Sequence, residues 1–353
     1  MEITSACDQD CPVCYAKKSN SNSYLSIDQI DKMLDFLVKA EGGQAEILQI
    51  SGGEPTLHRD LFQIIDLAMS KSINFVMLNT NGNRMVNDES FVNALGKYKN
   101  RFEIYLKFNG FSKEANIYFE NKSSHNTKLK AIDNLLSNGI PITLVTMVEN
   151  GINENEIGSI LEFALNRPGI RGINFQCVAR YDYSENFNDT SFATVSEIIN
   201  HIDQQSSGMI CKQDIFPLPC NIHGNAISFL FRDKKGFSPV TNLIDIHEHL
   251  NLVGNTLNFD ATAISKDILK SSKNQCCSFD LLDKLKPIIP EGWVTKSQEK
   301  QKNFINNNTF RISITAFQDR FNFDCNTIKK ECVHVITPDL KRIPFSTYNL
   351  LYR

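Results

Sequence analysis

The stretch Cys7-Asp8-Gln9-Asp10-Cys11-Pro12-Val13-Cys14-Tyr15 places three thiols in one short loop, directly after a predicted strand, Glu2–Ser5. Three thiolates at this spacing can hold one face of a [4Fe–4S] cubane and leave its fourth iron without a protein ligand. A structural zinc site needs four ligands, usually from two spaced pairs, and no fourth Cys or His stands beside these three. The spacing therefore favours an iron–sulfur cluster with one open iron, with structural zinc as the alternative.

The chain has 353 residues, of which 41% are hydrophobic, and a formal net charge of −3. It can bury a substantial core, and no clustered basic run indicates a nucleic-acid partner. Its apolar runs are too short for a membrane span and its first residues do not resemble a signal peptide, so we expect a cytoplasmic protein. Ten cysteines in such a chain indicate metal or redox chemistry, because disulfides are typical of small secreted domains.

Short apolar runs alternate with segments of helical period through the first half of the chain. Such units predict a parallel sheet with right-handed crossovers, and six of them are too few to close an eight-stranded barrel. The predicted fold class is therefore α/β, a partial (β/α)6 TIM-like barrel with an irregular C-terminal extension. The predicted strands are Glu2–Ser5, Glu46–Ile50, Ile73–Leu78, Phe102–Phe108, Pro141–Met147 and Gly172–Cys177, and the predicted helices cover residues 26–40, 58–70, 89–98, 127–138, 154–166 and 195–205.

The alternation of predicted strands and helices ends after about residue 207. This change predicts a barrel over residues 1–207 and a second region over residues 208–353. This second region is irregular and rich in Phe, Pro and Asn, with an expected helix near residues 278–286 and a strand at 310–316. We expect it to supply a substrate pocket or an auxiliary metal centre.

Polar motifs follow the ends of several predicted strands. Gly52, Gly53, Glu54 and Pro55 end the second strand, where glycines allow close backbone approach and carbonyl groups can accept hydrogen bonds from a ligand's ammonium group. Asn79, Thr80 and Asn81 end the third strand, and Asn174 and Gln176 lie in the sixth; amides and hydroxyls of this kind suit ribose hydroxyls and a carboxylate. Taken alone, each motif is more often an ordinary turn or a structural contact than a binding site.

Further side chains are expected at the same mouth of the barrel. Lys107 and Asn109 lie at the end of the fourth strand, and Thr146 and Asn153 belong to the fifth strand and its loop. Lys107 and Tyr181 are the two candidates for a catalytic acid or base.

The order of Cys7-x3-Cys11-x2-Cys14-Tyr15, Gly52-Gly53-Glu54-Pro55 and Thr80-Asn81-Gly82 on successive strands resembles the radical S-adenosylmethionine superfamily over about residues 1–205. The resemblance implies that the three cysteines bind the cluster, that Gly52–Pro55 bind the methionine amine and that Tyr15 lies near the adenine. It also implies reductive cleavage of S-adenosylmethionine to a 5′-deoxyadenosyl radical, with a flavodoxin or ferredoxin as electron donor.

A narrower resemblance links Asn174-Phe175-Gln176, Asp214–Cys220, Cys332-Val333-His334 and Ile343–Asn349 to the archaeal tetraether synthase and methanopterin C-methylase group. It implies C–C bond formation or one-carbon transfer at an unactivated C–H bond of a small or lipid-like substrate. The chain departs from this group at Ser346, where Cys is usual, and at Asn109, where Asp is usual.

Cysteines outside the triplet leave two interpretations. Cys177 and Cys211 are expected to be small buried side chains. Four of the five others could hold an auxiliary iron centre, or they are a reduced structural remnant; these are Cys220, Cys276, Cys277, Cys325 and Cys332. Two other functions stay open: a peptide maturase with an auxiliary cluster, and a non-catalytic iron–sulfur or zinc protein that binds a partner.

Overall fold

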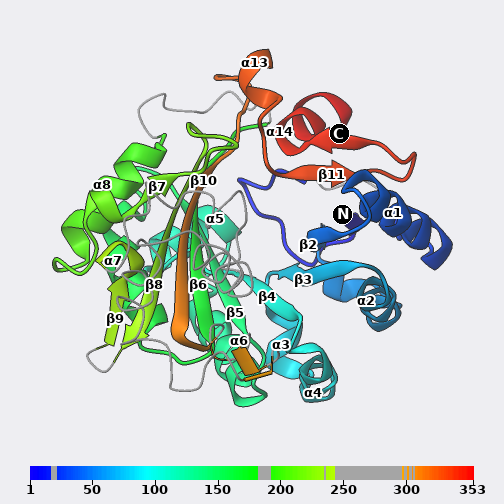
Figure 1. The fold of residues 1–353 in the computed structure, drawn as a ribbon, viewed down its shortest axis with the longest axis horizontal. Coiled ribbons are helices and arrows are strands. Elements are labelled where there is room, and N and C mark those ends of the chain that lie inside the picture. Colours follow the sequence, from blue (N-terminus) through cyan, green and yellow to red (C-terminus); the bar gives the residue numbers. More distant parts are fainter. Residues whose placement is uncertain are drawn as a thin grey trace, which may run out of the picture.

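A ten-stranded sheet organises the computed structural model, which describes residues 1–16, 22–181, 192–233, 236–242, 296–297, 300–301, 304 and 307–353 (Figure 1). Its first six strands are parallel and lie side by side in chain order. The predicted strands and fold class are confirmed. These strands are β1 (Glu2–Thr4), β2 (Ala45–Gly52), β3 (Ile73–Thr80), β4 (Phe102–Lys107), β5 (Ile142–Val148) and β6 (Ile170–Cys177).

Helices connect the parallel strands and cover the outer face of the sheet (Figure 1). Ser26 begins the first of them with a capping box, in which its side chain accepts from Gln29 N and the Gln29 side chain accepts from Ser26 N. The helices are α1 (Ile27–Ala40), α2 (Leu61–Ser70), α3 (Asn83–Asn87), α4 (Glu89–Leu95), α5 (Lys113–Glu120), α6 (His125–Ser137), α7 (Ile157–Leu165) and α8 (Val195–Gln205). Short 3₁₀ turns are η1 (Pro55–Leu57), η2 (Gly96–Tyr98), η3 (Glu154–Glu156), η4 (Lys212–Asp214) and η5 (Val240–Asn242).

The sheet continues into the second half of the chain. The expected strand at 310–316 is present as β10 (Thr309–Ala316), and it pairs in parallel with β6. On its other side β10 pairs antiparallel with β8 (Asn225–Asp233), which also pairs with β7 (Phe216–Pro217) and β9 (Gly236–Pro239). The predicted boundary at residue 207 is therefore crossed by one continuous sheet, and the helix expected at 278–286 lies outside the described residues.

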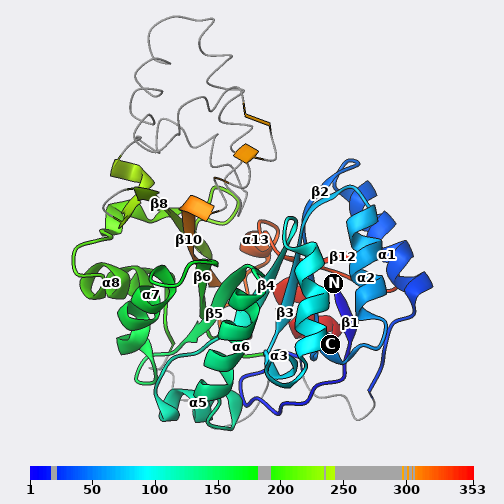
Figure 2. The same cartoon turned by 90° about the horizontal axis from the view of Figure 1, so that it is seen from below.

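The last residues fold back beside the first ones (Figures 1 and 2). A hairpin of β11 (His334–Ile336) and β12 (Arg342–Pro344) follows α13 (Cys325–Ile328) and precedes α14 (Phe345–Thr347) and the π-helical turn η8 (Tyr348–Tyr352). Arg342 Nη1 lies 2.6 Å from Glu41 Oε1, and Arg353 pairs with Glu2. The C-terminal segment is thus fixed to α1 and β1, close to the cysteine loop.

A cavity of about 480 Å³ lies against one face of the sheet. Side chains two residues apart on one strand point the same way, and one such face lines this cavity on β3, β5, β6 and β10. The opposite face packs against the helices in the main apolar core. None of the described helices has the length and apolar character that a bilayer crossing needs.

Candidate functional site

The cysteine loop leaves β1 at the carboxyl edge of the parallel sheet, where the polar motifs of β2 and β3 also end. Gly53 N donates to Thr4 O at 2.8 Å, and Glu54 N donates to Ala6 O at 2.7 Å. A Cβ atom at Gly53 would lie 2.2 Å from Ala6 O, and one at Gly52 would lie 2.2 Å from Thr4 O. The two glycines are therefore required by the chain itself, because they let the end of β2 pack directly on the residues that lead to Cys7.

The three thiols of the loop are free. Cys7 is half-buried, and burial raises the pKa of its thiol to about 11. The Cys11 thiol donates to Gln9 Oε1 at 3.3 Å, and exposed Cys14 donates to Ala16 O at 3.2 Å. In the described part of the chain, no three Cys, His, Asp or Glu side chains gather around a single metal position. A cubane does not require this, since each thiolate binds its own iron, and three free thiols on one loop fit such a cluster.

The Glu54 side chain joins the two polar motifs. Its Oε1 accepts from Thr56 N at 3.0 Å, Thr56 Oγ1 at 2.6 Å and Thr80 Oγ1 at 2.7 Å, and its Oε2 accepts from Asn81 N at 2.8 Å. Burial raises the pKa of this carboxyl group, and the four donors partly oppose that rise. Because the carboxylate is fully used within the chain, Glu54 orders the ends of β2 and β3.

Asp8, between the first two cysteines, fixes the loop to the turn after β3. Its two carboxylate oxygens accept from Asn81 Nδ2 at 2.6 Å and from Asn83 Nδ2 at 2.7 Å. Asn83 N in turn donates to Asn81 Oδ1 at 2.9 Å. The Asn81 side chain therefore orients the cysteine loop.

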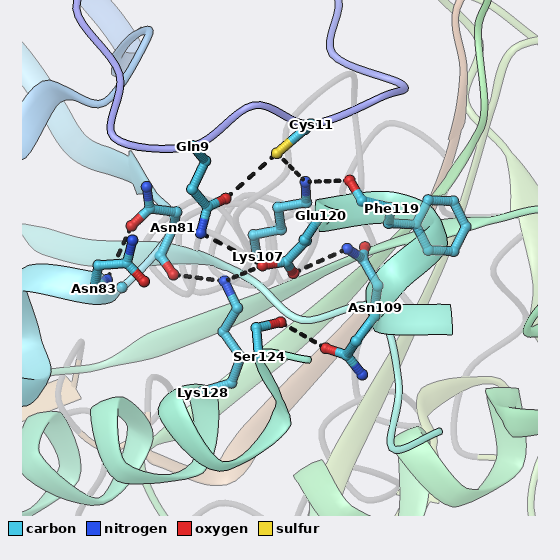
Figure 3. Close-up of polar contacts among 12 residues, drawn as sticks. Gln9, Cys11, Asn81, Asn83, Lys107, Asn109, Phe119, Glu120, Ser124 and Lys128 are labelled. Atoms are coloured by element: carbon cyan, nitrogen blue, oxygen red, sulfur yellow. Dashed lines mark hydrogen bonds and ion pairs between the residues drawn. The ribbon is translucent and has the colours of Figure 1, made fainter. Parts of the chain in front are cut away.

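A buried polar network lies beneath the loop (Figure 3). Lys128 Nζ pairs with Glu120 Oε2 at 3.1 Å and donates to Asn81 O at 2.6 Å. Glu120 also accepts from Gln9 Nε2 at 3.5 Å and from Asn109 Nδ2 at 3.2 Å. The network connects the cysteine loop to α5, α6 and the ends of β3 and β4.

Six of the predicted site residues line the cavity: Tyr15, Asn79, Asn174, Gln176, Tyr181 and Cys332. Asn174 donates to the hydroxyl of Tyr105 and accepts from Thr315 Oγ1 at 3.1 Å. Burial raises the pKa of Tyr105 to about 12, so its phenol stays neutral. The cavity thus combines amide and hydroxyl groups with apolar walls, a composition that suits a small polar ligand.

An aromatic group closes one side of the cavity around Phe345. Its ring lies 5.0 Å from the Tyr15 ring, 4.2 Å from the Phe317 ring and 6.3 Å from the Tyr181 ring, measured between centroids. Burial raises the pKa of both tyrosines above the ordinary value, so neither provides a phenolate base near neutral pH. This placement is compatible with Tyr15 near an adenine and does not favour Tyr181 as a proton acceptor.

Other predicted site residues do not line the cavity. Thr146 lies between the lining residues Val145 and Met147, so it faces the opposite side of β5, where its hydroxyl donates to Phe108 O at 2.7 Å. Asn109 Oδ1 accepts from Met147 N at 3.1 Å, and Asn153 Nδ2 donates to Asn109 O at 2.8 Å. These three side chains hold the ends of β4 and β5 together on the side away from the cavity. Lys107 contacts Cys11 instead of the cavity, with Nζ 3.4 Å from Sγ.

The cysteines of the C-terminal region do not form the predicted auxiliary centre among the described residues. Cys220 and Cys332 are joined in a disulfide, so neither thiolate is available to iron, and Cys325 is exposed on α13. Ser346, where the related group usually has Cys, donates to Glu331 Oε1 at 2.7 Å. Cys276 and Cys277 lie outside the described residues. Cys177 is buried, as predicted, and Cys211 is partly exposed.

Residues 1–164, which contain the cysteine loop, match the model of the Radical SAM superfamily. Residues 1–164 are a radical SAM domain. The whole chain is 29% identical to the 7,8-dihydro-6-hydroxymethylpterin dimethyltransferase of Methanocaldococcus jannaschii and covers 76% of that protein. It is 25% identical to the GTP 3′,8-cyclase of Staphylococcus epidermidis over 66% of this chain and 67% of that one.

Solved structures also resemble part of the chain. One of them, native anSMEcpe with bound AdoMet, is 16% identical, with a TM-score of 0.46 over 59% of this chain and 58% of that chain. The chain thus spans little more than half the length of that protein. A radical SAM domain implies a [4Fe–4S] cluster and S-adenosylmethionine, and together with the dimethyltransferase relative it supports an enzyme.

Gln9, Glu120 and Lys128 are site residues that sequence reasoning missed. A signal was present for Lys128, which stands three, four and seven residues before Ala131, Ile132 and Leu135 on the buried face of α6. A lysine at a core position of an amphipathic helix indicates a buried partner. Gln9 and Glu120 carry no comparable signal, because short polar segments are usually exposed.

Proposed function

We propose that this chain is a radical SAM enzyme that activates an unactivated C–H bond of a small molecule and transfers a one-carbon unit to it or forms a C–C bond. The observation that carries the proposal is that the cysteine loop and the cavity adjoin: Tyr15 directly follows Cys14 and lines the cavity. The full-length similarity to a pterin dimethyltransferase supports one-carbon transfer and suggests a reduced pterin as the first substrate to test.

In this proposal Cys7, Cys11 and Cys14 hold the cluster. When bound, the cluster and S-adenosylmethionine supply an electron and a carbon-centred radical that abstracts hydrogen. Gly52 and Gly53 keep the loop at the sheet edge, and Asp8 fixes its orientation through Asn81. Cys7 must lose its thiol proton to bind iron as a thiolate, and burial raises the pKa of this thiol to about 11.

The cavity residues orient the substrate beneath the loop. Asn174 and Gln176 present amides from β6, and Thr315 presents a hydroxyl from β10. Phe317 and Phe345 provide apolar surface on the same side as Tyr15. Exclusion of water by this aromatic group would protect a reactive carbon radical from side reactions.

The first experiment measures S-adenosylmethionine cleavage. Anaerobically reconstituted protein with dithionite and S-adenosylmethionine should release 5′-deoxyadenosine, and Cys11→Ala should reduce release to the protein-free background. Cys325→Ala is the matched control, since that exposed thiol lies outside the loop. Undiminished 5′-deoxyadenosine from the Cys11→Ala protein would overturn the proposal.

The second experiment tests the fate of the methyl group. With S-adenosylmethionine deuterated in its methyl group and 7,8-dihydro-6-hydroxymethylpterin, mass spectrometry should find deuterium in the pterin. Cleavage that leaves the mass of the pterin unchanged would contradict this substrate. Label or crosslinks in an added peptide would instead favour the peptide-maturase alternative.

A further inference from the structure

Lys107 occupies the point where the cavity meets the cysteine loop. It is the last residue of β4 and stands two positions after Tyr105, so it leaves the strand on the side that lines the cavity. Its Nζ lies 3.4 Å from Cys11 Sγ and 3.4 Å from Phe119 O (Figure 3). Its ammonium group therefore contacts a proposed cluster ligand and not the floor of the cavity.

The charge of Lys107 is not neutralised by a carboxylate. Of the ion pairs that the described residues form, none includes Lys107. The neighbouring Lys128 is paired with Glu120 at 3.1 Å, and the side chains of that pair are 1% and 0% exposed. The Lys128–Glu120 pair is neutral overall, so the positive charge of Lys107 lies against Cys11 without a carboxylate partner of its own among the described residues.

Two adjacent residues of α5 fix both the lysine and the loop. Phe119 O accepts from Lys107 Nζ, and Glu120 Oε2 accepts from Gln9 Nε2 at 3.5 Å. Gln9 Oε1 in turn accepts from the Cys11 thiol at 3.3 Å. Because Lys107 and Cys11 are held from the same helix end, their contact is a built feature of the fold and not a chance approach of a flexible side chain.

We propose that Lys107 is a positioning residue that raises the reduction potential of the cluster held by Cys7, Cys11 and Cys14. The inference rests on the proposed function. Reduction adds one electron to the cluster, and a fixed cation beside a ligand sulfur stabilises the more negative, reduced state. The potential of an iron–sulfur cluster depends on such charges and on hydrogen bonds to its sulfurs. Lys107 thus eases electron entry instead of transferring a proton to substrate.

The test measures the potential of the reconstituted cluster without S-adenosylmethionine, by an EPR-monitored redox titration. In Lys107→Met, the ratio of reduced to oxidised cluster at the wild-type midpoint should fall about tenfold, which is about 59 mV for a one-electron couple. Lys107→Arg should keep the wild-type potential. Lys113→Met, which removes the same charge from an exposed position at the start of α5, should not shift it.

Each outcome decides between the inference and its opposite. An unchanged potential in Lys107→Met overturns the inference while leaving the proposed function intact, whereas a wild-type protein that assembles no [4Fe–4S] cluster ends the proposed function. If Lys107→Met loses the cluster, the titration is repeated with Lys107→Gln, which keeps a hydrogen-bond donor but has no charge. A wild-type potential in Lys107→Gln also overturns the inference. Loss of the cluster from both uncharged variants also overturns the inference, because Lys107 is then needed to assemble the cluster and not to set its potential.

Discussion

The Lys128–Glu120 pair places two opposite charges in the interior, 3.1 Å apart, with hydrogen bonds to Asn81, Asn109 and Gln9 around them. Removal of charges from water costs several kcal/mol per ion, so such a pair is seldom retained for stability alone. Here every partner belongs to a segment that ends at the cysteine loop. The pair therefore holds the cysteine loop in a fixed position relative to α5 and α6.

Lys128→Met should lower the free energy of unfolding by about 3–5 kcal/mol, because it leaves Glu120 buried without its cation. The double variant Glu120→Gln/Lys128→Met should recover most of this loss. Denaturant unfolding of the two single variants and the double variant measures the coupling. A single Lys128→Met protein as stable as wild type would show that the pair is not buried in solution.

The same lysine gives a pH dependence of defined sign. Burial lowers the pKa of Lys128 below its usual value of 10.5. As pH rises toward 10.5, the folded state gives up this proton before the unfolded state does, so the contribution of Lys128 makes the protein more stable with rising pH. The slope of unfolding free energy against pH in this alkaline range should be more positive in wild type than in Lys128→Met. An equal slope would contradict the lowered pKa.

At the scale of elements, β1 is only three residues long, and its pairing with β2 depends on the close approach at Gly52 and Gly53. Gly52 has φ of +136°, a conformation that residues with a Cβ rarely adopt. The end of β2 and the start of the cysteine loop therefore form one rigid unit.

Gly53→Ala should destabilise the fold by about 1–3 kcal/mol and reduce iron incorporation, since the new Cβ would lie 2.2 Å from Ala6 O. Gly96→Ala is the control: its Cβ would lie 3.6 Å from Asn138 O in right-handed backbone, so it should be neutral or stabilise by about 0.4–1 kcal/mol. Chemical denaturation and iron content after reconstitution measure both. Normal iron loading in Gly53→Ala would show that the loop does not need this contact.

The sequence predicts the elements whose signal is local. Buried apolar runs identify the six parallel strands, and Ser26 marks the start of α1. Helix α3 has five residues, too few to show a period, and α5 was missed although Ser112 is a recognisable N-cap that accepts from Ala115 N. The pairing of β10 with β6 has no local signal, because the partners are far apart in sequence.

One continuous sheet joins the described residues on both sides of the predicted domain boundary at residue 207. β6 has β5 on one side and β10 on the other, and β10 supplies the cavity residues Ser313 and Thr315. A barrel ending at residue 207 would expose the edge of β6. Exposed strand edges favour association between chains.

A fragment of residues 1–207 should consequently form oligomers or precipitate, whereas the full chain should not associate through this edge. Size-exclusion chromatography with light scattering and circular dichroism on the two proteins test this. A monomeric fragment with cooperative unfolding would instead establish residues 1–207 as an independent domain.

The contact between Asn174 and Thr315 spans 141 residues of chain, whereas the network beneath the cysteine loop is complete once residue 128 has been added. At ordinary translation rates the ribosome needs roughly 10 to 40 s to add the chain between residue 128 and residue 315. During synthesis the three thiols can therefore reach their places while the far wall of the cavity does not yet exist. We therefore expect iron to reach the thiols of the nascent protein most easily from that side, before β10 docks on β6.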